Sequence, residues 1–374
     1  MSKRKLRIGV LFGGRSGEHE VSLMSARSVL SALDPEKYEV MQIGIAHTGE
    51  WFAGVNVLES MIENRLDELT PVVFLADPTR SGFYSLRETP SHGKLLEMLE
   101  TPEVIFPVLH GTFGEDGAMQ GLFELSDIAY VGAGVLGSAV GMDKGLFREV
   151  MVANHIPVVE TELVLRSELE ADMQNVLERV EHKLGGYPVF VKPANLGSSV
   201  GITKCHTRSD LMEGLMEAAR YDRRILIEKA VQAREIEVSV LGNDRPLASV
   251  PGEIIPSREF YSYEAKYLNG ASQLLIPAPI SSETMEKVRD LALRAYRAVD
   301  CSGMARVDFF LDKYSGELYL SEINTIPGFT QISMYPKLWE ASGLSYPDLL
   351  DRLIELALER KADRDRMERR YQAR

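Results

Sequence analysis

The most informative residues lie in the segment MARVDFFLDKYSGELYLSEINTIPG, residues 304–328. Arg306 and Asp308 alternate along one predicted strand, and Glu322 and Asn324 alternate along the next. Side chains two residues apart on a strand point to the same face. A turn at Gly316 that pairs the two strands in antiparallel fashion would bring Asp308 beside Glu322 and Asn324, with Arg306 next to them. Two carboxylates and an amide oxygen are hard ligands suited to Mg²⁺.

A solvent-exposed hairpin with polar residues on its wet face would show the same alternation. After Asn324, however, the sequence T-I-P-G-F-T-Q has the irregular turn residues expected of a ligand-binding loop. A regular hairpin end does not need them. We therefore favour a site for a metal ion and a phosphate group.

A glycine-serine loop, 197–199, lies between two predicted strands, 187–192 and 200–204. Its backbone N–H groups and two hydroxyls can approach phosphate oxygens closely. Lys192 before the loop and Lys144 upstream supply positive charge where a triphosphate would lie. The segment lacks the G-K-[ST] sequence that opens a helix in a P-loop, so we expect an antiparallel hairpin. Taken alone, the loop is equally consistent with a flexible solvent loop.

The following strand, 225–229, fits the edge of an adenine pocket. Glu228 and the backbone near Val231 would contact the base, and Glu235 could hold ribose hydroxyls. Each of these signals is weak alone. Combined with the two lysines and the glycine-serine loop, they predict a binding site for ATP.

The elements that position these residues begin with an open α/β region. A helical pattern follows the first apolar run, which predicts a βαβ unit and a parallel sheet with helices on its faces. A further short strand precedes a glycine-rich turn, and the stretch 47–100 is poorly periodic and is expected to be a lobe or long excursion. The apolar runs are 7–12, 40–45, 104–109 and 129–131.

The order of predicted helices and strands changes from Met142 onward. We predict helices at 142–155, up to about 183, after 280 and at 347–358, and strands at 187–192, 200–204, 225–229, 235–241, 304–311 and 317–323. The charged segment 359–374 is expected to be a solvated, partly frayed helix.

Composition narrows the function classes. Hydrophobic residues make up 45% and charged residues 26%, which predicts packed cores rather than disorder. A formal net charge of -13 argues against a nucleic-acid surface. Cys205 and Cys301 lie in no cluster that would predict a disulfide scaffold or a zinc site. With no signal peptide or apolar run of membrane-spanning length, we expect a cytoplasmic protein without a membrane partner.

These motifs, in this order, resemble the ATP-grasp fold and specifically the D-alanine–D-alanine ligase family. The resemblance covers about residues 9–335, and its N-terminal E-H-E-V-S and G-E-D-G stretches are specific to this ligase group. It implies an α/β protein, α+β in its C-terminal half, with three domains at 1–125, 126–225 and 226–374. The matching stretches are GGRSGEHEVSLMSA, FPVLHGTFGEDGAMQG, VGAGVLGSAVGMDK, VKPANLGSSVG, YEAKY, RVDFFL and SEINTIPGFT.

The resemblance also implies a role for individual residues. The ATP-binding set comprises Lys144, Lys192, Gly197, Ser198, Ser199, Glu228, Lys229, Val231 and Glu235. The ligands of two Mg²⁺ ions, which Mn²⁺ can replace, comprise Asp308, Glu322 and Asn324. The set that binds and joins the substrates comprises Glu18, His110, Ser198, Lys266, Tyr267, Arg306, Gly328 and Ser333.

The implied reaction uses ATP to join two D-alanine molecules through D-alanyl phosphate, giving ADP and phosphate for peptidoglycan precursor synthesis. The segment Ser257–Gln273 is expected to close over the site, and a tyrosine at 267 favours the dipeptide over D-alanyl-D-lactate. A homodimer is implied as well. D-alanine–D-lactate ligation, another ATP-grasp carboxylate–amine ligase and a non-catalytic nucleotide-binding module are the alternatives. The last of these should lack one of the metal or arginine residues, and none is missing.

Overall fold

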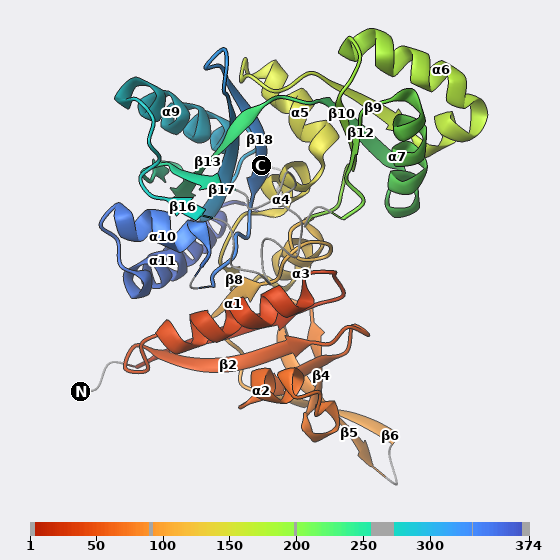
Figure 1. Ribbon diagram of the computed structural model, residues 1–374. Helices are drawn as coiled ribbons and strands as arrows, with labels where there is room; N and C mark the ends of the chain where they lie inside the picture. The colour runs from red at the N-terminus through yellow and green to blue at the C-terminus, as the bar shows by residue number, and fades with distance from the viewer. Residues whose placement is uncertain (1–3, 90–92, 198–199, 256–272, 331, 369–374) are drawn as a thin grey trace, which may run out of the picture.

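The computed structural model describes residues 4–89, 93–197, 200–255, 273–330 and 332–368. They form three regions, each built on a β-sheet with helices packed against it (Figure 1). Within these ranges, no helix combines the length and the apolar character that crossing a membrane requires.

The N-terminal region is an open sheet whose central strands are parallel, as predicted. In its centre β1 lies between β2 and β7, and β8 pairs with β7 at the end of the sheet. These strands are covered on both faces, so they read as nearly continuous apolar runs. The elements are β1 (Leu6–Gly13), β2 (Tyr38–Ile45), β7 (Val104–Val108), β8 (Ala129–Tyr130), α1 (His19–Ala32) and α3 (Ala118–Ser126).

The poorly periodic stretch 47–100 extends this sheet instead of forming a separate lobe. Its strands continue from β2 in the antiparallel order β3, β4, β5, β6. Side chains such as Leu95 and Leu96 on the edge strand are exposed, so the usual alternation of apolar and polar residues is missing. The elements are β3 (Trp51–Gly54), α2 (Val57–Ile62), a 3₁₀ turn (Leu66–Glu68), β4 (Pro71–Leu75), β5 (Gly82–Thr89) and β6 (Gly93–Met98).

The predicted glycine-rich turn after β8 is present, with Gly132 at a φ of 97°, but it is followed by a helix that was not predicted, α4 (Val135–Met142). Its glycines serve close packing: a Cβ on Gly137 would lie 3.1 Å from the Cα of Cys301, and one on Gly141 would lie 3.1 Å from a methyl of Ile323. The predicted helix 142–155 is likewise corrected to α5 (Lys144–Ala153). Asp143 separates the two helices and caps α5 by accepting the backbone N–H of Leu146 at 2.9 Å.

The central region carries an antiparallel sheet in the order β11, β10, β12, β9. The predicted hairpin around 197–199 is confirmed, because β10 and β11 pair directly. The region has its own core, formed by residues such as Val191, Leu211 and Ile227. The elements are β9 (Thr161–Leu165), α6 (Arg166–Leu184), β10 (Val189–Pro193), β11 (Thr203–Cys205), α7 (Arg208–Tyr221) and β12 (Arg224–Lys229).

The C-terminal region is built on a sheet in the order β16, β15, β13, β17, β18, with β14 paired to β13. Both predicted hairpin strands, β17 and β18, are present. Cys205 of the central region and Cys301 here are both free and buried. The elements are β13 (Ala233–Leu241), β14 (Leu247–Ala248), β15 (Gly252–Ile255), β16 (Gln273–Leu275), α9 (Ser282–Ala298), β17 (Met304–Asp312), β18 (Leu318–Asn324), α10 (Met334–Ala341) and α11 (Tyr346–Arg364).

The last helix, α11, packs back onto the N-terminal region, and its Leu353 and Ile354 share one core with Ile8 and Val10 of β1. The predicted helix after residue 358 is confirmed up to Arg364, and most of its side chains are exposed. Only Arg360, Lys361 and Arg364 depart from the predicted solvation, because they are partly buried against the N-terminal region. The charge pattern of the segment could not predict these contacts, because the groups that accept hydrogen bonds from its arginines lie far away in the sequence.

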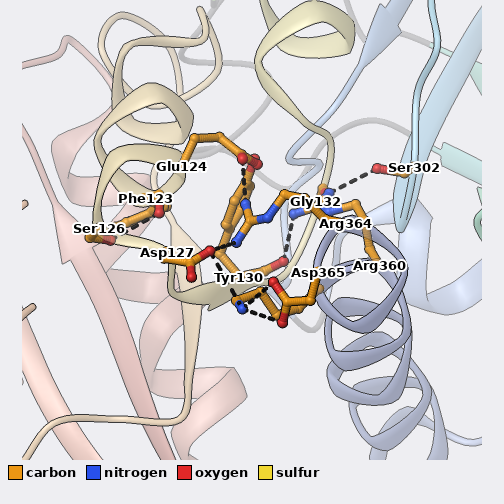
Figure 2. Close-up of polar contacts among 11 residues, drawn as sticks. Phe123, Glu124, Ser126, Asp127, Tyr130, Gly132, Ser302, Arg360, Arg364 and Asp365 are labelled. Carbon is orange, nitrogen blue, oxygen red and sulfur yellow. Dashed lines mark hydrogen bonds and ion pairs between the residues drawn. The ribbon is translucent and has the colours of Figure 1, made fainter. Parts of the chain in front are cut away.

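Two arginines attach this part of α11 to the N-terminal region (Figure 2). Arg360 donates to the carbonyls of Tyr130, at 2.9 Å, and of Gly132, and to the Ser302 hydroxyl at 2.8 Å. Its guanidinium also lies 4.1 Å from the centre of the Tyr130 ring. Arg364 pairs with Glu124 and, at 3.1 Å, with Asp127.

Candidate active site

A cavity of about 1120 Å³ is lined by residues of all three regions. Every described residue with a predicted role lies on its wall. Of the remaining predicted residues, Ser198, Ser199, Lys266 and Tyr267 lie outside the described part of the chain, as does the segment 257–272. Those on the wall are Glu18, His110, Lys144, Lys192, Gly197, Glu228, Lys229, Val231, Glu235, Arg306, Asp308, Glu322, Asn324, Gly328 and Ser333.

The pairing of β17 with β18 brings the predicted metal ligands together. Asp308 lies opposite Glu322, and Arg306 lies opposite Asn324. The register shifts directly after Asp308, which marks a β-bulge at this position. Bulges re-aim side chains and occur often beside active sites. The arrangement expected from the alternation of residues is therefore present.

The donor set fits a hard divalent cation. Among the residues that the structure describes, no three His, Cys, Asp or Glu side chains gather in a way that could hold a metal ion. An ion bound to Asp308 and Glu322 would therefore rely on the amide oxygen of Asn324 and on oxygens from a bound phosphate or water. Mg²⁺ is usually held in this manner, by one or two carboxylates and substrate phosphates.

Arg306 is paired with two carboxylates. Its guanidinium donates to Asp308 through Nε at 2.8 Å and Nη2 at 2.6 Å, and its Nε also lies 3.0 Å from Oε2 of Glu237 on β13. Burial by itself lowers the pKa of Arg306, but the charges of Asp308 and Glu237 outweigh it and raise that pKa well above its ordinary value. The arginine is thus held charged on the cavity wall.

A buried ion-pair network lies on the side of the cavity predicted to bind the nucleotide. Glu228 pairs with Lys192 and, at 2.5 Å, with Arg148, whose other Nη donates to the carbonyl of Leu320 at 2.7 Å. Burial raises the pKa of Glu228, but Lys192 and Arg148 outweigh this effect and lower it to about 2. The carboxylate therefore holds Lys192, while its predicted contact with adenosine stays a prediction.

Lys144, at the start of α5, lies against the glycine-serine loop. Its Nζ donates to the carbonyl of Leu196 at 2.7 Å, one residue before Gly197. Burial, the largest effect, lowers the pKa of this lysine. An anion bound beside the ammonium would replace part of the lost solvation, as expected of a phosphate-binding lysine.

Glu18, the N-terminal cap residue of α1, lies close to Gly197 of this loop. A Cβ built on Gly197 would approach Oε2 of Glu18 to 2.9 Å, and one built on Gly111 would approach the same oxygen to 2.4 Å. Glycine at both positions gives the carboxylate room. The arrangement brings Glu18 to the residue next to Ser198, its predicted partner.

His110 is buried and has both ring nitrogens engaged. Nδ1 lies 3.0 Å from the carbonyl of Ile326 and Nε2 lies 3.1 Å from the hydroxyl of Ser25. A carbonyl can only accept, so the proton is assigned to Nδ1, and Nε2 accepts from Ser25. Burial is the main reason why the pKa of His110 is lowered, so the ring is held neutral.

Gly328 and Ser333 lie together just before α10. A Cβ on Gly328 would lie 2.8 Å from the hydroxyl oxygen of Ser333, which also accepts the backbone N–H of Thr330 at 3.0 Å. Ser333 is the N-terminal cap residue of α10. A helix start offers free N–H groups to an anion, which suits the carboxylate predicted to bind at Ser333.

Sequence reasoning missed Glu115, Arg148 and Glu237. Glu115 accepts the backbone N–H groups of Gly111 at 2.7 Å and Ile326 at 3.2 Å, which joins the N-terminal region to the loop after β18. Burial and the charge of Glu18 raise its pKa to about 8. Glu115 belongs to the G-E-D-G stretch, and Glu237 shares a strand face with Glu235, so a sequence pattern could have indicated that both residues belong to the site. Arg148 had none.

Comparisons with known proteins agree with this geometry. Family models described as D-ala D-ala ligase N-terminus and C-terminus match residues 7–133 and 150–355. A D-alanine--D-alanine ligase from Heliobacterium modesticaldum is 50% identical over 362 residues, covering 97% of both chains. One from Natranaerobius thermophilus is 49% identical over 366 residues, covering 97% of this chain and 98% of that protein.

Solved structures show the same fold. The D-alanine-D-alanine ligase from Coxiella burnetii has a TM-score of 0.81 at 38% identity, covering 96% of this chain and 97% of the other. The VanG D-Ala:D-Ser ligase from Enterococcus faecalis has a TM-score of 0.82 at 35% identity, covering 95% and 100%. These neighbours have the ATP-grasp fold, which confirms the predicted fold class. This chain belongs to the D-alanine–D-alanine ligase family.

Proposed function

We propose that this chain joins two D-alanine molecules to D-alanyl-D-alanine at the expense of ATP, releasing ADP and phosphate, for peptidoglycan precursor synthesis. The observation that carries the proposal is the composition of the cavity. It combines the carboxylates of Asp308 and Glu322, the ammonium groups of Lys144 and Lys192, and the Glu18 carboxylate. Membership of the ligase family supports the same reaction.

The nucleotide would bind between the central and C-terminal regions. Glu228, Lys229, Val231 and Glu235 follow one another along the end of β12 and the start of β13, and they would contact adenosine. Lys144 and Lys192 would hold the phosphates, with the loop 197–199 closing over them.

The first step activates a carboxylate. A free carboxylate is a poor acyl donor, so transfer of the γ-phosphoryl group would convert it to D-alanyl phosphate. Lys144 and Lys192 would offset the charge on the moving group, and Glu228 keeps Lys192 in position. Two Mg²⁺ ions at Asp308, Glu322 and Asn324, with Mn²⁺ as a substitute, would supply further charge neutralisation when bound.

The first D-alanine would bind at the N-terminal wall. Glu18 would pair with its ammonium group, and Ser198 and Tyr267 would join Glu18 in a hydrogen-bonded cluster. His110 would lie near the carboxyl end of this D-alanine. Burial holds its ring neutral, so it would add no charge beside the carboxylate that receives the phosphoryl group. These contacts would aim the carboxylate at the γ-phosphate.

The second step forms the peptide bond. The amine of the second D-alanine would attack D-alanyl phosphate, while Ser333 receives the carboxylate of this substrate and Lys266 contributes to its site. The resulting oxyanion would be stabilised by Arg306 and the Gly328 N–H, a kind of contact worth about 3–4 kcal/mol per donor. Closure of the segment 257–273 would keep water from hydrolysing the acyl phosphate.

The setting of the reaction follows from the same family membership. We propose that the protein works in the cytoplasm as a homodimer and without nucleic-acid or membrane partners. Size-exclusion chromatography with light scattering would test the dimer.

One assay tests the reaction. Purified protein with ATP and Mg²⁺ should release phosphate and form a dipeptide when D-alanine is added, with far less release for L-alanine, D-lactate or no amino acid. D-serine supplied together with D-alanine examines the choice at the second position. Phosphate release that does not depend on D-alanine would remove the proposal.

A further inference from the structure

Arg306 has two acidic partners on two different strands. Asp308 binds it through both carboxylate oxygens, and Glu237 on the neighbouring strand lies 3.0 Å from its Nε. All three side chains are at least four-fifths buried and line the cavity. A buried guanidinium that loses its counter-charge is strongly destabilised, so at least one carboxylate must stay with it.

The two partners differ in what else they must do. The Asp308 oxygens that accept from Arg306 are the same atoms that a divalent cation at the predicted metal site requires. Glu237 on β13 is the direct partner of Asp308 on β17, whereas Glu322 lies on β18, on the other side of β17. It can therefore keep its contact with Arg306 when a cation competes for Asp308.

The backbone holds Glu237 firmly in place. β13 is a central strand whose register with β17 runs from Ala233 opposite Asp312 to Leu241 opposite Met304. On its other side, Glu237 pairs with Gly252 of β15. The neighbouring Ile236 and Val238 are fully buried in the core beneath. A carboxylate on such a strand has little freedom to follow a moving partner, so it defines a fixed point for the guanidinium.

We propose that Glu237 is a positioning residue, which keeps Arg306 directed at the reaction centre while Asp308 binds the divalent cation. The inference rests on the proposed ligase function and deepens it. Glu237 touches neither substrate in this account. Its effect on catalysis passes through the orientation of Arg306, the donor assigned to the oxyanion.

The first test is Glu237→Gln in the full-length enzyme. We expect kcat to fall about 10–100-fold, as is typical when a supporting contact of a catalytic group is lost, with the KM values for ATP and D-alanine within about twofold of the parent. Glu253→Gln is the matched control. It removes a buried carboxylate of β15 that pairs at 2.6 Å with Arg234, an arginine on the same strand as Glu237. This control should keep kcat.

A double-mutant cycle with Arg306→Lys then separates a positioning role from a general structural one. If Glu237 acts through Arg306, Glu237→Gln should cost little further kcat in the Arg306→Lys background. Losses that multiply would overturn the proposal. So would a Glu237→Gln enzyme whose kcat returns to the parent value at high Mg²⁺, because Glu237 would then be a metal ligand itself.

A readout apart from activity is the Arg306 Nε–H signal in protein labelled with [¹⁵N]arginine, in the presence of Mg²⁺ and ADP. The signal, assigned by its absence in Arg306→Lys, should be protected from exchange in the parent and lost in Glu237→Gln. A signal equally protected in both would sink the inference. If the parent releases no phosphate with D-alanine, the proposed function fails instead, so the two failures are distinguishable.

Discussion

Replacing Glu228 with glutamine should destabilise the protein strongly. The substitution keeps the shape of the side chain but removes the negative charge that pairs with both Arg148 and Lys192. Glu228 is 2% exposed and Arg148 is 4% exposed, so solvent cannot compensate. Removing one partner of a buried ion pair costs about 3–5 kcal/mol. Two hydrogen bonds to charged groups, at about 1.5–3 kcal/mol each, lead to a similar figure.

Urea unfolding followed by far-UV circular dichroism measures this loss. The matched control is Glu63→Gln, which removes a carboxylate paired with Arg65 at 2.5 Å on the surface, where the side chains are 55% and 45% exposed. The control should unfold like the parent, because exposed ion pairs contribute little. A Glu228→Gln protein within about 1 kcal/mol of the parent would refute the view that this buried network depends on its carboxylate.

The pH dependence adds a second check. The pKa of Glu228 falls from its ordinary value of 4.5 to about 2 in the folded protein. The ionised carboxylate therefore stabilises the fold fully above pH 4.5, and this contribution is lost as the pH falls through about 2. The gap in unfolding free energy between parent and Glu228→Gln should be constant near neutral pH and shrink on acidification. A gap that widens in acid would contradict the assignment.

Four further predictions concern other parts of the molecule. Glu322→Ala should abolish ATP-dependent ligation, because a metal ligand is lost, while circular dichroism shows an intact fold; parent-like turnover would exclude the metal site. Tyr267→Phe should raise the yield of D-alanyl-D-lactate when D-lactate is offered, and chromatography that finds no increase would remove the specificity argument. The His110 ring should remain neutral in an NMR titration down to below pH 6.5, because burial lowers its pKa. Since His110 takes up its proton more readily in the unfolded chain, the folded protein should lose stability as the pH falls below 6.5. Arg360→Met should speed hydrogen exchange at the end of α11, because the bonds to Tyr130 and Gly132 are lost, whereas the exposed Arg366→Met should not.

Local patterns in the sequence were enough to predict part of the site. Asp308 and Glu322 could be paired in advance, because alternation on two strands joined by a short turn leaves few possible registers. The hairpin around 197–199 was predictable from two strand-like runs that flank a glycine-serine loop. The parallel strands at the start of the chain were predictable from apolar runs that alternate with a helical pattern. The roles of Glu18, His110 and Ser333 came from the family resemblance alone, whereas those of the two lysines and the metal ligands also had support from local patterns. All of these roles remain predictions.

The tertiary structure alone decided which distant groups meet. Arg148 of α5 reaches Glu228 of β12 and Leu320 of β18, and Arg360 reaches Tyr130 across more than half of the chain. Periodicity reports which face of an element is buried, but it carries no information about the partner on the other side. Ion pairs and hydrogen bonds between elements depend on how whole sheets and helices pack. The sequence by itself therefore determined the local hairpin that carries the acidic residues, while the packing of the three regions determined which charges hold those residues in place.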